Sequence, residues 1–194
     1  DTNLSDRVLI LEDTNHDGIF DKATIYADDL PWPTAVFCYD GGIFVGATPD
    51  LLYFKDINGD GRADVRKKIF TGFGAGKDKL NVQALFNSFN WGLDNKIHGQ
   101  TAGNGGLVGH AATPDEKPLD LRGRDFWFDP RTLEIGAEAG GGQYGMCFDD
   151  HGRKWVCSNS DHIQAFLYDS RYAERNPYYN MPPPRVSIAA DGGA

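Results

Sequence analysis

The sequence predicts an all-β fold of the β-propeller type, and three observations support this prediction. First, the stretch 56–64 (DINGDGRAD) repeats the stretch 13–21 (DTNHDGIFD) at an offset of 43 residues. An offset of roughly 40–50 residues is typical of the four-stranded blades of a propeller. Second, apolar runs alternate with turns rich in Asp, Asn and Gly, which is the chemistry of hairpins. Third, the sequence shows no amphipathic helix of any length.

The hairpins account for about three four-stranded blades of a six-bladed ring. This number of blades is too small to close a ring, so we expect the chain to be a fragment of a larger propeller. The stretch from Thr101 to Arg124 is expected to be a long insert between the second and third strands of one blade. The expected units are a partial blade of two outer strands (8–27), two blades (33–70 and 87–138), the start of a further blade (143–169) and an irregular tail with a short helical excursion (170–194).

Both repeated stretches have the calcium-loop pattern D-x-N-x-D-G-x-x-D. Oxygen ligands stand on alternate residues, and the Gly allows the chain to turn back around a hard cation. The bidentate Glu of an EF-hand is absent, because Thr24 and Lys67 hold the twelfth position, and strands rather than helices flank each loop. Two acidic, Asx-rich turns without an ion are the alternative. The predicted ligands are Asp13, Asn15, Asp17 and Asp21 in the first loop, and Asp56, Asn58, Asp60 and Asp64 in the second.

Composition narrows the partners and the compartment. Charged residues make up 24% of the chain and the formal net charge is −9, which disfavours nucleic acid as a partner. The chain has no long apolar run and no basic-then-apolar N-terminus, so we expect neither a membrane span nor a signal peptide within the sequence shown. Its cysteines, Cys38, Cys147 and Cys157, form no C-x-x-C motif and are expected to be small buried apolar residues. Weak calcium sites suit millimolar calcium, so we expect a periplasmic or extracellular location.

A propeller sorts its loops onto two rims, and this predicts a ligand face. The calcium-type loops join third to fourth strands, on the rim away from the usual ligand face. The opposite rim gathers amides, an imidazole and guanidinium groups, which suit a polar ligand such as a sugar or a quinone. Each of these residues alone is equally a turn former or a surface ion-pair partner. The candidates are Arg122, Arg124, Gln143, Asn159 and His162, whereas His98 is expected to be a hydrogen-bonded core histidine.

Several motifs together resemble one family. They are the first calcium-type loop, PDLLY at 49–53, NSFNWGLDN at 87–95, LRGRDF at 121–126 and CSNSDHI at 157–163. The chain resembles the propeller domain of large secreted bacterial proteins that are named membrane-bound dehydrogenases and carry a haem-binding C-terminal domain. That domain is similar to the six-bladed propeller of the soluble quinoprotein sugar dehydrogenases, which use pyrroloquinoline quinone and calcium.

The resemblance implies oxidation of a small sugar or alcohol, with electrons passed to haem. His162 would be the catalytic base, and Arg122, Arg124, Gln143 and Asn159 would bind the quinone. The chain has no C-x-x-C-H motif, so haem is expected only on a domain outside this chain. The expected partners are the rest of the parent polypeptide and a cytochrome c domain. The alternative is a non-catalytic propeller that binds glycans or protein partners and uses calcium structurally.

Overall fold

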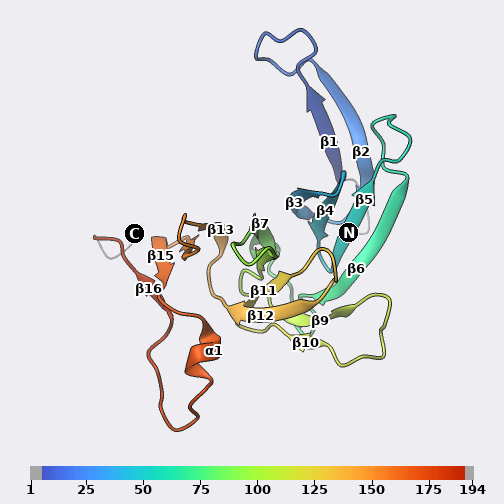
Figure 1. Ribbon diagram of the computed structural model, residues 1–194. Coiled ribbons are helices and arrows are strands. Elements are labelled where there is room, and N and C mark those ends of the chain that lie inside the picture. Colours follow the sequence, from blue (N-terminus) through green and yellow to red (C-terminus); the bar gives the residue numbers. More distant parts are fainter. Residues whose placement is uncertain (1–5, 191–194) are drawn as a thin grey trace.

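The structure, a computed structural model, describes residues 6–190, and these form an all-β fold as the sequence predicts. The strands make four antiparallel sheets, none of which closes on itself (Figure 1). Helical structure in the described part is limited to a 3-10 turn at Val82–Ala84 and a short helix, α1 (Ser170–Ala173). No helix within residues 6–190 is long and apolar enough to cross a membrane.

The first sheet is a two-stranded ribbon. Strands β1 (Asp6–Glu12) and β2 (Lys22–Leu30) pair antiparallel on either side of the first Asp-rich loop. Tyr26 anchors the second Asp-rich loop to this ribbon, because its hydroxyl accepts a hydrogen bond from the Asp56 N–H at 3.1 Å. Its carbonyl also accepts the Ala63 N–H at 2.9 Å. The second Asp-rich loop is therefore held against β2 by direct contacts.

The second sheet contains a four-stranded meander. Asp40 and Gly41 form its first turn with φ values of +49° and +69°, and two positive φ angles suit the tight hairpin turn that matches strand twist. The other two turns are Thr48–Pro49 and the second Asp-rich loop. The strands are β3 (Pro33–Tyr39), β4 (Gly42–Ala47), β5 (Asp50–Lys55) and β6 (Val65–Phe73).

The predicted insert adds strands to this second sheet. β9 (Gly106–His110) pairs with β6, and β10 (Leu119–Asp120) pairs with β9. The free edge of β6 offers unpaired backbone groups, and Gly72 and Gly106 allow the two backbones to meet. A Cβ at Gly72 would lie 2.0 Å from the Leu107 carbonyl oxygen. The prediction of a long turn at this place is thus corrected in part, because two segments of the insert, β9 and β10, belong to a sheet.

The third and fourth sheets are also four-stranded meanders. The tail was predicted to be irregular, but Arg185–Ser187 forms β16 against β15 and completes the fourth sheet. Its three residues and flanking prolines hid this strand in the sequence. The third sheet comprises β7 (Asn87–Trp91), β8 (Ile97–Gln100), β11 (Arg124–Phe128) and β12 (Ile135–Ala139), and the fourth comprises β13 (Tyr144–Phe148), β14 (Lys154–Ser158), β15 (Asp161–Phe166) and β16.

The first strands of the last three sheets lie next to one another. β7 contacts both β3 and β13, while later strands of each sheet lie farther out (Figure 1). Side-chain amides join these strands, since Asn90 Nδ2 donates to the Met146 carbonyl at 2.7 Å and Asn87 Nδ2 donates to the Gln143 carbonyl at 2.9 Å. The apolar core between the second and third sheets is largely aromatic. Its fully buried rings include Phe70, Phe73, Phe86, Phe126 and Phe128.

Two of the cysteines do not lie where the sequence predicted. Cys38 and Cys147 are exposed and Cys157 is half-buried, so the expectation of three buried residues is wrong. Cys38 stands on β3 and Cys147 on β13, which are the first strands of their sheets. The face of each first strand that carries the cysteine is not covered by residues 6–190.

Replacing Phe126 by Ala is expected to lower the free energy of unfolding by about 3–5 kcal/mol. Phe126 is fully buried and packs against Phe73 and Phe86, so truncation leaves a cavity in the aromatic core. Urea denaturation of both proteins measures the change. Leu167→Ala is the control, because Leu167 is 67% exposed and its truncation should change the stability by less than about 0.5 kcal/mol. Equal effects of the two substitutions would contradict this placement of the core.

Candidate functional site

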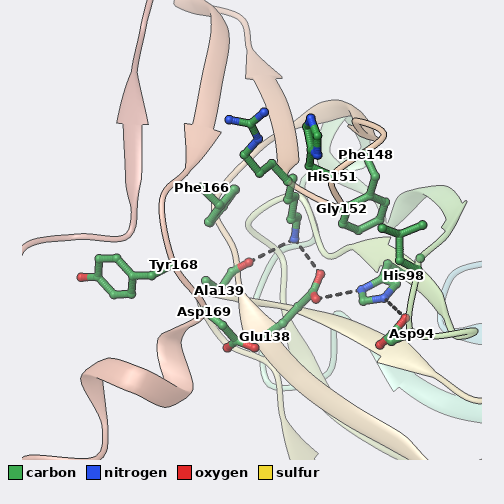
Figure 2. Close-up of a pocket in the computed structure, with 14 residues that line it drawn as sticks. Asp94, His98, Glu138, Ala139, Phe148, His151, Gly152, Phe166, Tyr168 and Asp169 are labelled. Atoms are coloured by element: carbon green, nitrogen blue, oxygen red, sulfur yellow. Dashed lines mark hydrogen bonds and ion pairs between the residues drawn. The ribbon is translucent and has the colours of Figure 1, made fainter.

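A pocket of about 380 Å³ lies where the third and fourth sheets meet (Figure 2). Its wall combines aromatic rings with ionisable groups, which is the composition of many ligand sites. The residues that matter most for its chemistry are His98, Glu138, Phe148, Lys154, Phe166 and Tyr168.

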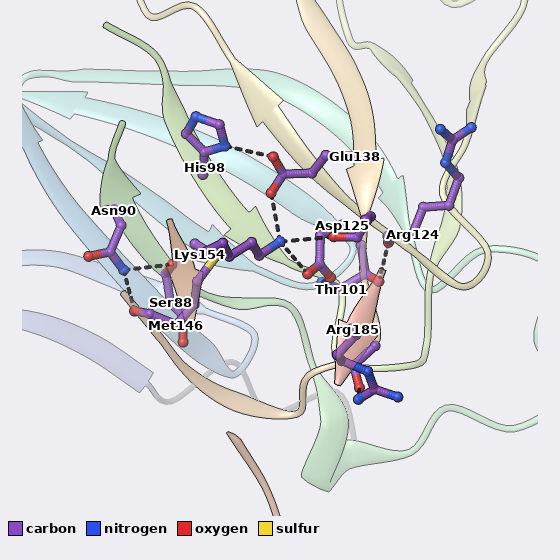
Figure 3. A network of polar contacts seen from close by, with 12 residues as sticks. Ser88, Asn90, His98, Thr101, Arg124, Asp125, Glu138, Met146, Lys154 and Arg185 are labelled. Carbon is purple, nitrogen blue, oxygen red and sulfur yellow. Dashed lines mark hydrogen bonds and ion pairs between the residues drawn. The ribbon is translucent and has the colours of Figure 1, made fainter. Parts of the chain in front are cut away.

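The Lys154 ammonium lies at the centre of a buried polar network beside this pocket (Figure 3). Lys154 is the first residue of β14, and its side chain reaches from the fourth sheet into the third. Nζ donates to Asp125 Oδ2 and to Glu138 Oε1, each at 2.7 Å, and to the Ala139 carbonyl at 3.1 Å. All three donors of the ammonium are therefore used.

Burial and pairing set the charges in this network. Burial alone would lower the pKa of Lys154, but the charges of Asp125 and Glu138 outweigh it and raise that pKa above its ordinary value. Burial also opposes ionisation of Glu138, yet Lys154 and His98 together lower its pKa. Asp125 is fully buried, and burial raises the pKa of its carboxyl despite the contact with Lys154. An ammonium and the Glu138 carboxylate are thus stable inside the protein.

His98 extends the network to the pocket mouth. The residue lies on β8 and is 7% exposed, with Nδ1 2.8 Å from Glu138 Oε2 and Nε2 3.1 Å from Asp94 Oδ1. Burial alone would lower the pKa of His98, but the hydrogen bonds and charges of Glu138 and Asp94 raise it above 6.5. The expectation of a hydrogen-bonded core histidine agrees with these contacts.

The arrangement suits a clamp between sheets better than a catalytic centre. A general base needs a lone pair within reach of substrate, whereas both ring nitrogens of His98 and all donors of Lys154 already have partners. Asp125 is also fixed from behind, because its Oδ1 accepts the Thr101 N–H at 3.1 Å. The network joins β8, β11 and β12 to β14. The pocket lies beside the network, and His98, Glu138 and Lys154 form part of its wall.

The arginines predicted to bind a quinone are engaged with carboxylates. Arg122 is exposed in the turn before β11, and its Nε donates to Asp120 Oδ1 at 2.9 Å. Arg124 begins β11, and its guanidinium donates to Glu174 Oε1 at 3.0 Å. This ion pair ties the third sheet to the segment that follows α1.

The other predicted site residues lie in the fourth sheet and beside it. Gln143 precedes β13 and Asn159 follows β14, and the structure brings them together, because the Asn159 N–H donates to Gln143 Oε1 at 3.2 Å. His162 is an exposed residue on β15. None of the five predicted residues lines the pocket described above.

The first Asp-rich loop turns its carboxylates toward its own backbone. Asp13 accepts the N–H groups of Asp17 and Gly18, and Asp17 accepts that of Ile19. Asp21 closes the loop by accepting the Thr14 N–H at 3.0 Å, and this contact lowers the pKa of the Asp21 carboxyl. The carboxylates of Asp13, Asp17 and Asp21 therefore hold the turn in shape through hydrogen bonds from its own backbone.

The second loop repeats this geometry. Asp56 accepts the N–H groups of Gly59 and Gly61, which lowers the pKa of its carboxyl. Residues four and six of both loops have positive φ: Gly59 (+81°) and Gly61 (+83°) correspond to His16 (+62°) and Gly18 (+88°). Asn58 and Asp60 accept from residues two positions on, as Asn15 and Asp17 do.

The two loops share one backbone conformation, but their side chains are not arranged as a complete set of metal ligands. Within the part of the chain that the structure describes, no three His, Cys, Asp or Glu side chains are grouped closely enough to hold a metal ion. Each loop instead combines carboxylates with an Asn amide, and a cation would need these oxygens to converge further. The donor chemistry, all oxygen, is that of calcium.

Sequence reasoning did not single out Lys154, Glu138 or Asp125. Each lies in a short strand and reads as a solvated charge on an alternating pattern. One signal was present, since Asp125 lies in the aromatic-rich strand RDFWF and Lys154 directly precedes Trp155 in KWVCS. A charged side chain in a strand that is rich in aromatic residues lies either at the edge of a sheet or in an ion pair inside the protein.

One family model matches residues 1–194 in full, and its description is a domain of unknown function, DUF7133. The chain belongs to this family. None of the curated proteins matches it. Among solved structures, the extracellular domain of a one-component system protein from B. thetaiotaomicron is similar, with 12% identity and a TM-score of 0.40. The match covers 85% of this chain but 19% of that one, so the chain spans about a fifth of that structure's length.

Lys154→Met is expected to lower the free energy of unfolding by about 3–5 kcal/mol, because it leaves the Asp125 and Glu138 carboxyls buried without their cation. Arg153→Met is the matched control one residue earlier. Arg153 is exposed and pairs with Asp149 at 2.8 Å, so its loss should cost at most about 1 kcal/mol. Chemical denaturation measures both, and a Lys154 variant as stable as the Arg153 variant would show that the network does not hold the sheets.

The His98 pKa predicts a pH dependence of stability. The folded pKa is raised above 6.5, so the stabilisation is fully present below the unfolded pKa and is lost as the pH rises through the folded pKa. The melting temperature should therefore fall as the pH rises from about 6.5 through the folded pKa of His98, and His98→Gln should flatten this fall. A variant whose pH profile parallels that of the wild type would refute the prediction.

Proposed function

We propose that this chain is part of an extracytoplasmic β-propeller that binds calcium in its two Asp-rich loops and serves as a non-catalytic binding scaffold. One observation carries the proposal: β7 lies between β3 and β13, and each of these strands begins a four-stranded meander. Sheets whose first strands meet while their later strands diverge have the arrangement of blades around an axis. In this interpretation the ribbon β1–β2 is the outer half of another blade.

Calcium is supported by the matching conformation of the two loops. Both have residues with left-handed backbone conformation at positions four and six. In the first loop position four is His16, for which this conformation is less favourable than it is for Gly59 in the second loop. A side chain is rarely held in this conformation without a structural reason. Carboxylate and amide oxygens on alternate residues then supply hard donors, and the bound ion would neutralise clustered Asp residues.

The contacts of the residues predicted to hold pyrroloquinoline quinone give that cofactor no support. Arg122 and Arg124 already neutralise Asp120 and Glu174, and Gln143 is occupied by the backbone of Asn159. We therefore assign no redox step to this chain. Sugar or alcohol oxidation with transfer to haem stays a prediction from the resemblance, and a scaffold that binds glycans or proteins is the function we propose.

The extracytoplasmic location follows from the ligand set. Each loop offers three or four side-chain donors and lacks the bidentate Glu of tight sites, so we expect a dissociation constant in the range of extracellular modules, about 0.1–1 mM. Such a site is filled where calcium is millimolar. The periplasm and the cell exterior meet this condition.

Calcium added to the chelated protein is expected to raise its stability. At about 100 times the dissociation constant, each site contributes about 2.7 kcal/mol. Asp17→Ala and Asp60→Ala should each remove the contribution of one loop, and the double variant should not respond. The melting temperature with calcium, with magnesium and with chelator measures this.

Asp78→Ala is the control, since Asp78 is exposed and lies outside both loops, and it should keep the full response. A wild-type melting temperature that calcium leaves unchanged would rule out the ion sites. Reduction of a dye by the purified chain with a sugar and added quinone would contradict the non-catalytic part of the proposal.

A further inference from the structure

One face of the second sheet is covered at one end and bare at the other. Val36 on β3 stands opposite Val45 on β4, which stands opposite Leu52 on β5, so the three side chains form a row on one face. Val45 is 0% exposed and Leu52 is 5% exposed, because the ribbon β1–β2 lies over them. Val36, at the end of the same row, is 55% exposed.

A second row on this face shows the same gradient. Cys38 stands opposite Ile43, which stands opposite Phe54. Phe54 is 1% exposed and Ile43 packs against the same buried cluster, whereas Cys38 is exposed. The uncovered strip therefore runs along β3.

The strip continues into two hollows beside β1. One, of about 330 Å³, is lined by Val8 together with Val36 and Val45, and the adjoining one contains Trp32. Arg7, Pro33 and Thr34 line both. On this side β1 has no strand partner among residues 6–190, so its backbone N–H and C=O groups form an open edge.

The internal repeat indicates what is absent from this place. The Asp-rich loops make β1 and β2 the counterparts of β5 and β6, and β5 pairs on its other side with β4, which pairs with β3. No counterparts of β3 and β4 stand beside β1 in the described structure. Taking the blade arrangement proposed above as given, we propose that a two-stranded β-hairpin from polypeptide outside these 194 residues pairs with β1 and covers Val36 and Cys38.

The chemistry of the occupant follows from the surface. Its strand beside β1 forms backbone hydrogen bonds, and every second side chain on one face is apolar, to pack on Val36 and the Cys38 methylene. A second copy of this chain does not suit, because its own sheets after β2 already have four or more strands and offer no spare hairpin. The chain's own β3–β4 hairpin has the required pattern, and it is the natural probe.

The test uses the 194-residue chain and a synthetic peptide of residues 33–47 that carries Cys38→Ser. Maleimide labelling of the chain is followed by mass spectrometry at each cysteine. With the peptide at about ten times its dissociation constant, about 90% of sites are filled, so labelling of Cys38 should slow about tenfold. Cys147, exposed on β13 of the fourth sheet, should react at an unchanged rate.

Val36→Lys should abolish the protection, and Leu167→Lys, at a 67% exposed site directly after β15, should keep it. Unchanged Cys38 labelling at millimolar peptide, equal protection of Cys147, or protection that survives Val36→Lys would each overturn the inference. A failed peptide test with an intact calcium response would leave the calcium scaffold standing. The reverse pattern would remove the calcium sites and keep the hairpin-docking surface.

Discussion

The contact between the third and fourth sheets depends on the buried Lys154 ammonium, which reaches from β14 to carboxylates on β11 and β12. Burying these charges costs several kcal/mol per ion, and the cost is offset only where geometry and hydrogen bonding are nearly complete. The apolar cluster beside it is small: Met146, Val156 and Phe166. The polar network, together with the Asn90 hydrogen bond to Met146 on β13, therefore sets much of the relative position of the two sheets.

The fold class could be predicted because it depends on local patterns. Alternating apolar strands and Asp–Gly turns such as Asp40–Gly41 need only near neighbours to be recognised. The strands that sequence reasoning missed, β9, β10 and β16, exist because a distant edge accepts them. Two of them are only two or three residues long, and the pairing of β9 with β6 needs glycine at positions 72 and 106 both for close backbone approach and for the positive φ angles there.

The candidate site was harder to predict for a related reason. A charged residue on a strand has the same local pattern whether water or a buried partner faces it, so Lys154 and Asp125 could be identified only once β11 and β14 were placed together. His98 was the exception, because its position on a second strand already favoured burial. The Asp-rich loops were recognised because the hydrogen bonds of their own Asp side chains, such as those of Asp21 and Asp64, lie within nine residues.

The excursion of the chain through β9 and β10 limits where the chain can be truncated. Between β8 and β11 the polypeptide leaves the third sheet, adds strands to the edge of β6, and returns. Cutting the chain between the second and third sheets would remove β9 from the edge of β6, and Phe70 would lose its tilted ring contact with His110. These two sheets consequently form one cooperative unit, and truncation boundaries are better drawn before Asp6 or after Ala139 than between them.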